Sequence, residues 1–237
     1  MGIEISNFLA LTAEKISVAG AYLWQITKPM LYGSKITLSL FFIVIILSIP
    51  IGFCLTLAAK SKIKLISRLA KFFIYIMRGT PLLLQLLFVF FGLPTLPYIG
   101  KYLAFERFTA ACVAFTLNYA AYFAEIYRSG IESIPIGQYE AAHVLGYTRI
   151  QTFIKIIMPQ VIKRILPPVT NEVITLVKDT SLSFTLSVLE MFTIAKQISS
   201  SQTTMIPLIA AGVFYYIFNF IVAMGMEYIE KRLSYYR

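Results

Sequence analysis

Long apolar runs alternate with short polar stretches along the whole chain. The clearest run covers residues 36–59, carries no charge, and is long enough to cross the ~30 Å hydrocarbon core of a bilayer as a helix. A second clear run covers about residues 205–228, and weaker runs cover about 69–93, 108–127 and 167–188. The pattern predicts an all-α integral membrane protein with about five transmembrane helices.

The scarcity of charge agrees with this prediction. Charged residues make up 14% of the chain, against roughly 25% in an ordinary globular protein, which is too few to cover a water-facing surface. The net charge of +10 could indicate nucleic-acid binding, but the basic residues lie at the ends of the apolar runs, where they act as topology signals. We therefore expect the chain to contact the lipid bilayer and no nucleic acid.

Cysteine and histidine are too few for a disulfide framework or a metal centre. Cys54 and Cys112 both lie inside apolar runs, where a thiol usually serves as a small buried side chain. His143 is the single histidine of the sequence, which excludes a histidine-based zinc site. No bound metal is expected.

The first 30 residues are expected to form a separate segment. Glu4 and Glu14 interrupt any early apolar core, so a cleavable secretory signal is not predicted. Residues 1–30 are instead predicted to form a short amphipathic helix on the extracytoplasmic surface of the membrane, ended at Lys28–Pro29. The transmembrane domain is expected over residues 31–237.

Lysine and arginine are distributed unevenly between the two sides that five spans define. The loop after the first run, the central polar segment with its flanks, and the C-terminal end together hold thirteen of the 21. The opposite side holds six, while Arg78 and Lys178 lie within runs. Because the cytoplasmic side carries the excess of basic residues, we predict that the N-terminus is outside and that the central segment and the C-terminus are cytoplasmic.

The central polar segment, about residues 133–160, carries helix start and stop signals. Ser133 is predicted to cap a short helix that begins at Pro135, a residue favoured in the first helical turn. Gly146 supplies the left-handed residue that ends this helix. The segment is therefore predicted to contain a helix, a turn and a second helix.

The second helix is predicted from a capping box. Thr148 and Gln151 have the required spacing, so the helix is expected to begin there. It is expected to end at Pro159. One apolar stripe is predicted along it, formed by Ile150, Phe153, Ile154 and Ile157.

Two interpretations of this helix–turn–helix are open on periodicity alone. It could be a connecting loop that folds back on the bilayer, or a docking site for another protein. Ala141 and Ala142 lie beside Glu140 and form a small surface that lets another backbone approach closely. This feature favours the docking site.

The central segment resembles the EAA signature of the permease subunits of ABC importers. The sequence "EAAHVLGYTRIQTFIKIIMP" matches this signature at Glu140, Ala141, Ala142, Gly146, Ile156 and Pro159, with Met158 in place of the usual leucine. Further similarity extends through residues 31–40, 78–86, 118–142 and 171–182. The combination resembles the polar-amino-acid branch, which includes the histidine, glutamine and arginine permeases.

This resemblance implies a division of labour between subunits. Residues about 135–148 would be the coupling helix, with Glu140 as the polar contact to an ABC ATPase, Ala141 and Ala142 as the close-packed surface, and Gly146 as the turn. The chain has no phosphate-binding loop, so it is not expected to be an enzyme or to bind a cofactor, and ATP and Mg would be held by the partner ATPase.

The same resemblance implies the other partners and the location. A second permease subunit, identical or homologous, would complete the pathway, and an extracytoplasmic binding protein would deliver the amino acid. The assembly would lie in a prokaryotic cytoplasmic membrane as a multi-pass protein. The resemblance leaves open which amino acid is carried: arginine, lysine, histidine, glutamine and cystine all fit.

Charged residues within the apolar runs are candidates for the transport pathway, because charge inside a membrane is costly. Arg78 and Lys178 are expected to form internal ion pairs or to reach the interface. Asn118, Tyr122 and Glu125 stand at i, i+4 and i+7, so one helix face could bind the ammonium or cationic end of an amino acid. Further polar lining is expected from Asp179 and Thr180.

The sequence "RGTP" is predicted to open the second transmembrane helix. Pro81 cannot donate its backbone amide and Gly79 has no side chain, so carbonyls near Thr80 are freed. Such backbone is tolerated at membrane depth where it is buried or lines a cavity. The segment could therefore line a pathway, or it could be a simple kink.

Two other functional classes are alternatives to a transporter subunit. The main alternative is a stand-alone ion-conducting or scaffolding membrane protein, which would need no ATPase and no special role for Glu140. An intramembrane enzyme is disfavoured, because a Ser181–Lys178 pair would be its one candidate dyad and that spacing is common by chance.

Overall fold

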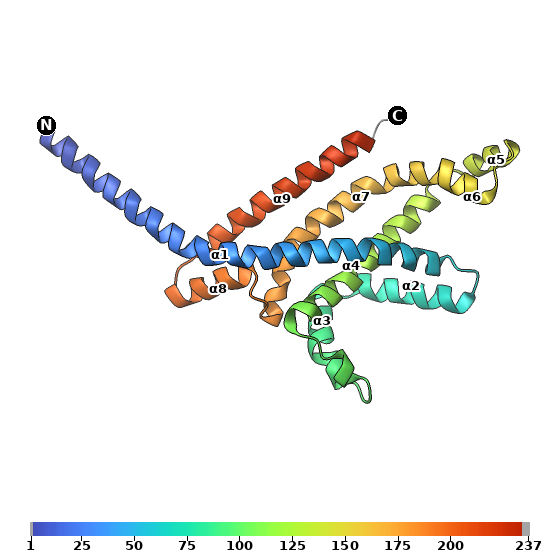
Figure 1. The fold of residues 1–237 in the computed structure, drawn as a ribbon, viewed down its shortest axis with the longest axis horizontal. Helices are drawn as coiled ribbons and strands as arrows, with labels where there is room; N and C mark the ends of the chain where they lie inside the picture. The colour runs from blue at the N-terminus through green and yellow to red at the C-terminus, as the bar shows by residue number, and fades with distance from the viewer. Residues whose placement is uncertain (1, 234–237) are drawn as a thin grey trace.

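A computed structural model describes residues 2–233, and the side chains of residues 14, 15 and 17–233. This part of the chain consists of helices and short connections and contains no strand, so the all-α prediction is confirmed (Figure 1). The α-helices are α1 (Gly2–Ala59), α2 (Lys64–Gly79), α3 (Leu82–Leu87), α4 (Arg107–Glu132), α5 (Ile136–Val144), α6 (Arg149–Thr152), α7 (Met158–Asp179), α8 (Met191–Gln202) and α9 (Ile206–Leu233).

Helix α1 is one continuous helix of 58 residues. The prediction that a separate helix ends at Lys28–Pro29 is therefore wrong. Pro29 and Pro50 both lie inside α1. The helix can continue through a proline because only one backbone hydrogen bond is lost, and neighbouring groups in an apolar helix can offset that loss. Figure 1 shows the N-terminal part of α1 projecting away from the other helices. Met1 lies outside the described residues.

Three segments of the described chain meet the length and hydropathy that a membrane span requires. They are Ser17–Ala59 within α1, Ile206–Leu233, and the pair formed by Lys64–Gly79 and Leu82–Thr95, which is bent by 112° at the intervening break. Helices α4 and α7 have 26 and 22 residues but are more polar. The count of about five transmembrane helices therefore stays a prediction.

The chain from Arg149 to Asp179 is helical without interruption. Helix α6 passes through a π-helical turn, Phe153–Ile157, directly into α7. The expected helix end at Pro159 is wrong, since this proline lies in the first turn of α7, directly after the π-helical turn. The helix that covers the span predicted at 167–188 therefore begins earlier, and a 3-10 helix, Thr180–Leu186, follows α7.

Helix α8 was not predicted from the apolar pattern. Its sequence alternates apolar and polar residues over only 12 positions and gives no long apolar run. The backbone of α8 approaches α1 closely, because a Cβ added at Gly33 would lie 2.9 Å from the Cα of Met191. A small residue at position 33 is thus required for the contact.

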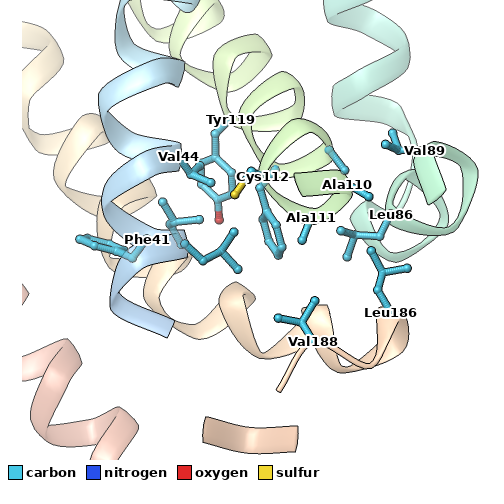
Figure 2. Packing of buried hydrophobic residues seen from close by; sticks show 14 of the residues in the cluster. Phe41, Val44, Leu86, Val89, Ala110, Ala111, Cys112, Tyr119, Leu186 and Val188 are labelled. Carbon is cyan, nitrogen blue, oxygen red and sulfur yellow. The ribbon is translucent and has the colours of Figure 1, made fainter. Parts of the chain in front are cut away.

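The core lies around α4, which packs between α1, α2 and α7 (Figure 2). Small buried residues on α4, including Ala110, Ala111 and Ala120, allow its neighbours to come close. A Cβ at Gly52 of α1 would lie 2.9 Å from the carbonyl oxygen of Ala120. Large side chains such as Phe115 fill the remaining space and are fully buried.

The two ends of the helix bundle differ in what they carry. Figure 1 places the α1–α2 connection and the α5–α6 segment at one end, and the start of α1 at the other. Helix α4 runs from the bundle into α5, and α6 returns into α7. The α5–α6 segment, Ile136–Thr152, is therefore held at the end of two long helices.

Candidate functional site

Helix α5 starts and stops close to the predicted residues. It begins at Ile136 with Pro135 as N-cap, and Gly146 beyond its end has φ +79. A Cβ at Gly146 would meet nothing within 4 Å, so the backbone conformation, rather than lack of space, favours glycine. The predicted cap by Ser133 is wrong, because its hydroxyl donates to the carbonyl of Gly130 at the end of α4 (2.7 Å).

The capping box at the start of α6 is confirmed. The Gln151 amide donates to Thr148 Oγ1 (3.3 Å), and the Thr148 amide donates to Gln151 Oε1 (2.9 Å). These two bonds satisfy amides that would otherwise lack partners at the helix start. The direction in which α6 leaves the turn is fixed by them.

The predicted apolar stripe on the second helix is divided between two faces. Ile157 is fully buried and Phe153 packs against the same cluster as Ile134 and Val161. Ile150 and Ile154 are exposed. The division arises because the π-helical turn Phe153–Ile157 adds a residue per turn and shifts the register of the side chains.

The outer face of α5 is exposed and partly apolar. Glu140 and Ala141 are exposed, whereas Ala142 is 1% exposed and packs within the chain. Ala142 therefore cannot belong to an outer contact surface without a rearrangement. Ile136 and Val144 are 74% and 86% exposed, and apolar side chains grouped at a projecting end are typical of a docking surface.

A groove runs beside Glu140 between α5 and α6. Its volume is about 530 Å³, and His143, the single histidine of the sequence, lines it. Arg149, at the start of α6, also lines the groove. The complete lining is Tyr139, Glu140, His143, Tyr147, Arg149, Thr152 and Phe153.

Asn118 stabilises the helix break rather than facing an open pocket. It is 4% exposed, and its amide donates to the carbonyl of Met77 (3.1 Å) and to Gln85 Oε1 (2.9 Å). Gln85 in turn donates to the carbonyl of Met77 (2.8 Å) and to Thr80 Oγ1 (2.8 Å). The two amides thus satisfy carbonyls that α2 leaves free where it ends.

The break itself lies at Gly79, Thr80 and Pro81. Helix α2 ends at Gly79. The next two residues, Thr80 and Pro81, have extended backbones, and α3 begins at Leu82. A Cβ at Gly79 would meet nothing within 4 Å. The break thus separates α2 from α3 as predicted, and its role in a transport pathway stays a prediction.

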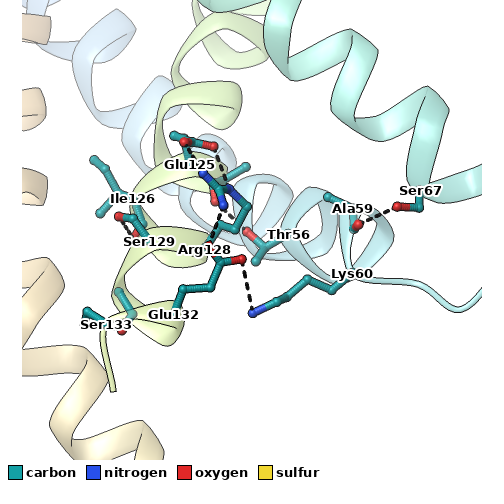
Figure 3. Close-up of polar contacts among 12 residues, drawn as sticks. Thr56, Ala59, Lys60, Ser67, Glu125, Ile126, Arg128, Ser129, Glu132 and Ser133 are labelled. Atoms are coloured by element: carbon teal, nitrogen blue, oxygen red, sulfur yellow. Dashed lines mark hydrogen bonds and ion pairs between the residues drawn. The ribbon is translucent and has the colours of Figure 1, made fainter. Parts of the chain in front are cut away.

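Glu125 is paired with two arginines. Its carboxylate accepts two hydrogen bonds from Arg128, at 2.6 and 3.0 Å (Figure 3). Arg78 lies 3.6 Å away and stacks over the ring of Tyr122, 5.5 Å from the ring centre. The expectation of an ion pair for Arg78 is confirmed. Tyr122 and Glu125 thus share Arg78, while Asn118 on the same helix points to the break.

Asp179 and Thr180 lie apart from Glu125 and have partners of their own. Tyr119 donates its hydroxyl to Asp179 Oδ2 (2.7 Å). Thr180 is buried and donates to the carbonyl of Val177 (2.7 Å). Ser181 donates to the backbone of Lys178 (2.7 Å), which gives no support to a Ser–Lys dyad.

Glu190 was missed by the sequence patterns, because glutamate is not among the usual N-cap residues. It is fully buried and accepts hydrogen bonds from the amides of Phe192 (2.8 Å) and Thr193 (2.7 Å) at the start of α8. Thr37 of α1 and Tyr215 of α9 also donate to it, at 3.3 and 2.9 Å. Burial raises the pKa of Glu190, and these hydrogen bonds oppose the rise.

Gln85 and Tyr119 were also missed. Gln85 is a single amide in the apolar sequence "LLLQLL", and such an isolated polar residue within a span is a signal for a buried hydrogen bond. Tyr119 gave no signal, because tyrosine is common in packed cores. Among the described residues, no group of three or more His, Cys, Asp or Glu side chains could hold a metal ion.

Comparison with known proteins gives a consistent result. Residues 48–235 match the family described as "Binding-protein-dependent transport system inner membrane component". The chain is 40% identical over 219 residues to the octopine transport system permease protein OccM of Rhizobium radiobacter, covering 90% of this chain and 89% of the relative. It is 36% identical over 206 residues to the arginine transport system permease protein ArtQ of Bacillus subtilis, with 86% and 92% covered.

A solved structure shares the fold over nearly the same range. A crystal structure of an amino acid ABC transporter with histidines superposes with a TM-score of 0.81 at 31% identity, covering 90% of this chain and 97% of that one. The MetNI methionine ABC transporter shares the fold with a TM-score of 0.67 at 18% identity. The chain therefore belongs to the inner membrane components of binding-protein-dependent transport systems.

Proposed function

We propose that the chain is the permease subunit of an ABC importer that moves a polar amino acid into the cytoplasm of a prokaryote. The exposed Glu140–Ala141 surface on the projecting α5 carries this proposal. It offers a docking site for a partner ATPase, which supplies the ATP hydrolysis. Relatives named for octopine, arginine and L-cystine transport support an amino acid as the substrate class.

The position of α5 supports a mechanical coupling to the membrane helices. Its preceding helix, α4, lies at the core, and its following helices lead directly into α7. Arg164 of α7 donates to the carbonyl of Ser133, at the junction of α4 and α5. A displacement of α5 by ATPase closure would therefore move α4 and α7 together, which is what alternating access requires.

We propose five crossings with the N-terminus outside. The bent pair α2–α3 is one crossing, and α1, α4, α7 and α9 supply the others. The α1–α2 connection and the α5–α6 segment lie at the same end of the molecule (Figure 1). The first carries Lys60 and Lys62 and the second carries Arg149, and basic residues mark a cytoplasmic side. A second permease subunit and an extracytoplasmic binding protein complete the assembly.

A cationic substrate is supported by acidic groups at two depths. Glu125 lies beside Tyr122 near one end of α4, and Asp179 lies beside Tyr119 nearer the middle of this helix. Both carboxylates are partly exposed, and each could exchange its present partner for the ammonium group of an amino acid. Asn118 and Thr180 are engaged with backbone carbonyls, so we assign them to the support of the site.

Reconstitution tests this function. The permease, its ATPase and its binding protein are incorporated into liposomes, and ATP hydrolysis is measured with arginine, lysine, histidine, glutamine and cystine. We expect hydrolysis to be stimulated by one or more of these amino acids and to depend on the binding protein. Ion conduction by the permease alone, with no ATPase bound, would instead support a stand-alone channel.

A further inference from the structure

A cavity of about 670 Å³ lies between the end of α1, one side of α2 from Ser67 to Arg78, and the end of α4. Lys60 and Ser61 in its lining place it beside the α1–α2 connection, which lies at the end of the bundle that also carries α5 (Figure 1). The connection and the start of α2 carry Lys60, Lys62 and Lys64. The cavity lining consists of Ala59, Lys60, Ser61, Ser67, Lys71, Ile74, Tyr75, Arg78, Glu125, Arg128 and Glu132.

The charges that line the cavity do not balance. Four are basic, Lys60, Lys71, Arg78 and Arg128, and two are acidic, Glu125 and Glu132. Arg128 binds both glutamates (Figure 3). Lys60 Nζ is 3.9 Å from Glu132, at the outer limit of an ion pair, and Lys71 is exposed. The cavity therefore has an excess of positive charge, concentrated in the two lysines.

Helix α2 places an apolar stripe next to these lysines. Its basic positions, Lys64, Arg68 and Lys71, follow at i, i+4 and i+7. Exposed apolar side chains, Leu65, Leu69, Phe72 and Ile76, follow the same spacing one residue later. A basic stripe beside an apolar stripe is the arrangement of a helix at a membrane interface.

We propose that this cavity binds the headgroup of an anionic phospholipid. The phosphate would contact Lys60 and Lys71, and an acyl chain would lie along the Leu65–Ile76 stripe of α2. Basic cavities between membrane helices at a cytoplasmic surface are suited to anionic lipid headgroups. A soluble phosphate would satisfy the lysines but leave the adjacent apolar stripe unused, so the lipid fits both features.

Native mass spectrometry of the assembled transporter tests this site. The permease with its ATPase is titrated with phosphatidylglycerol, and the double variant Lys60→Gln/Lys71→Gln is compared with Lys62→Gln/Lys155→Gln. The control removes the same charge, but from exposed residues that lie outside both the cavity lining and the basic stripe of α2. We expect about 25-fold weaker binding for the cavity variant, since each basic side chain contributes about fivefold near an anionic surface, and little change for the control.

Two further arms identify the ligand. Phosphatidylcholine is expected to bind much more weakly than phosphatidylglycerol, and the soluble glycerophosphoglycerol is expected not to displace it at equal concentration. Equal binding of the two lipids, equal loss in the two double variants, or displacement by the soluble phosphate would each overturn the proposal. If the cavity double variant does not assemble, Lys71→Gln alone provides the test, with about fivefold weaker binding expected and no change overturning it.

Discussion

At the scale of single residues, buried polar side chains decide how the helices meet. Asn118 and Gln85 satisfy the carbonyls at the end of α2, and Glu190 joins α1, α8 and α9. An unpaired carbonyl in such a place costs about 1–3 kcal/mol. We therefore expect these few contacts to stabilise the bend between α2 and α3 and the position of α8 against α1 and α9.

The Gln85→Leu variant tests the contribution of the amide at the break. We expect the free energy of unfolding to fall by about 1–3 kcal/mol, because the carbonyl of Thr80 loses a donor and the buried amide of Asn118 loses an acceptor. The change in stability of the variant is measured by thermal unfolding in detergent. Gln25→Leu, at an exposed position of α1, is the matched control and should change stability by no more than about 0.5 kcal/mol. Equal losses in the two variants would show that the break does not depend on Gln85.

Glu190 predicts a specific pH dependence of stability. Burial raises its folded-state pKa above the ordinary value of 4.5, so the folded state binds more protons than the unfolded state between these two values. Stability contributed by this group is then present at low pH and falls as the pH rises from about 4.5 through the folded pKa. Unfolding temperatures measured across this range should show that fall.

The Glu190→Gln variant isolates this effect. Glutamine keeps an acceptor for the amide of Thr193 but does not titrate, so the fall in stability with rising pH should flatten in the variant. A wild-type profile and a variant profile of the same slope would contradict the assignment to Glu190.

Which residues are brought together could be predicted only in part. Asn118, Tyr122 and Glu125 were placed on one helix face from their spacing, but Asn118 turns to the break in α2. The reason lies in Met77 and Gln85, which are distant in sequence and whose proximity follows from the 112° bend. Glu125 was correctly identified as an unusual charge, yet its pairing with Arg78 depends on how α2 packs on α4.

At the scale of elements, local signals were reliable where a backbone conformation required them. The capping box at Thr148 and the left-handed Gly146 are both present as predicted. The continuity of α1 through Pro29 and the π-helical turn before Pro159 were not predicted. Each depends on packing and on apolar surroundings that relax the usual effect of proline, and neither is encoded within a few residues.

Gly146 offers a test of the α5–α6 turn. Gly146→Ala is expected to cost about 1 kcal/mol, because a Cβ disfavours φ +79 even where space is open. The strain falls on the turn, so ATPase stimulation should fall more than the amount of folded permease. Gly137→Ala on α5, where a Cβ also meets nothing within 4 Å, is the control. An equal effect of both variants on stimulation would contradict this reading of Gly146.

At the scale of the whole molecule, the distribution of charge predicts the orientation. The α1–α2 connection and α5 lie at one end (Figure 1), and the loop after α3 carries the exposed Tyr98. Because basic residues mark the cytoplasmic side, the end that carries Lys60, Lys62 and Arg149 is expected inside the cell and Tyr98 outside. Sequence alone supports this assignment, since it depends on counts of charge and not on packing.

Labelling of single cysteines checks the orientation. With Cys54 and Cys112 replaced by alanine, Tyr98→Cys is expected to react with an impermeant thiol reagent in intact cells, whereas Lys62→Cys and His143→Cys should react only after the membrane is opened. Reaction of Lys62→Cys in intact cells would reverse the proposed topology.

The account depends most directly on α5 as the contact to an ATPase. Co-purification of the cognate ATPase is measured with the wild type, with Glu140→Arg/Ala141→Arg, and with Ala104→Arg/Glu106→Arg, which places the same substitutions at exposed positions before α4. The account predicts that the wild type and the α4 control retain the ATPase and that the α5 variant loses it. Equal retention by all three would contradict a coupling role for α5.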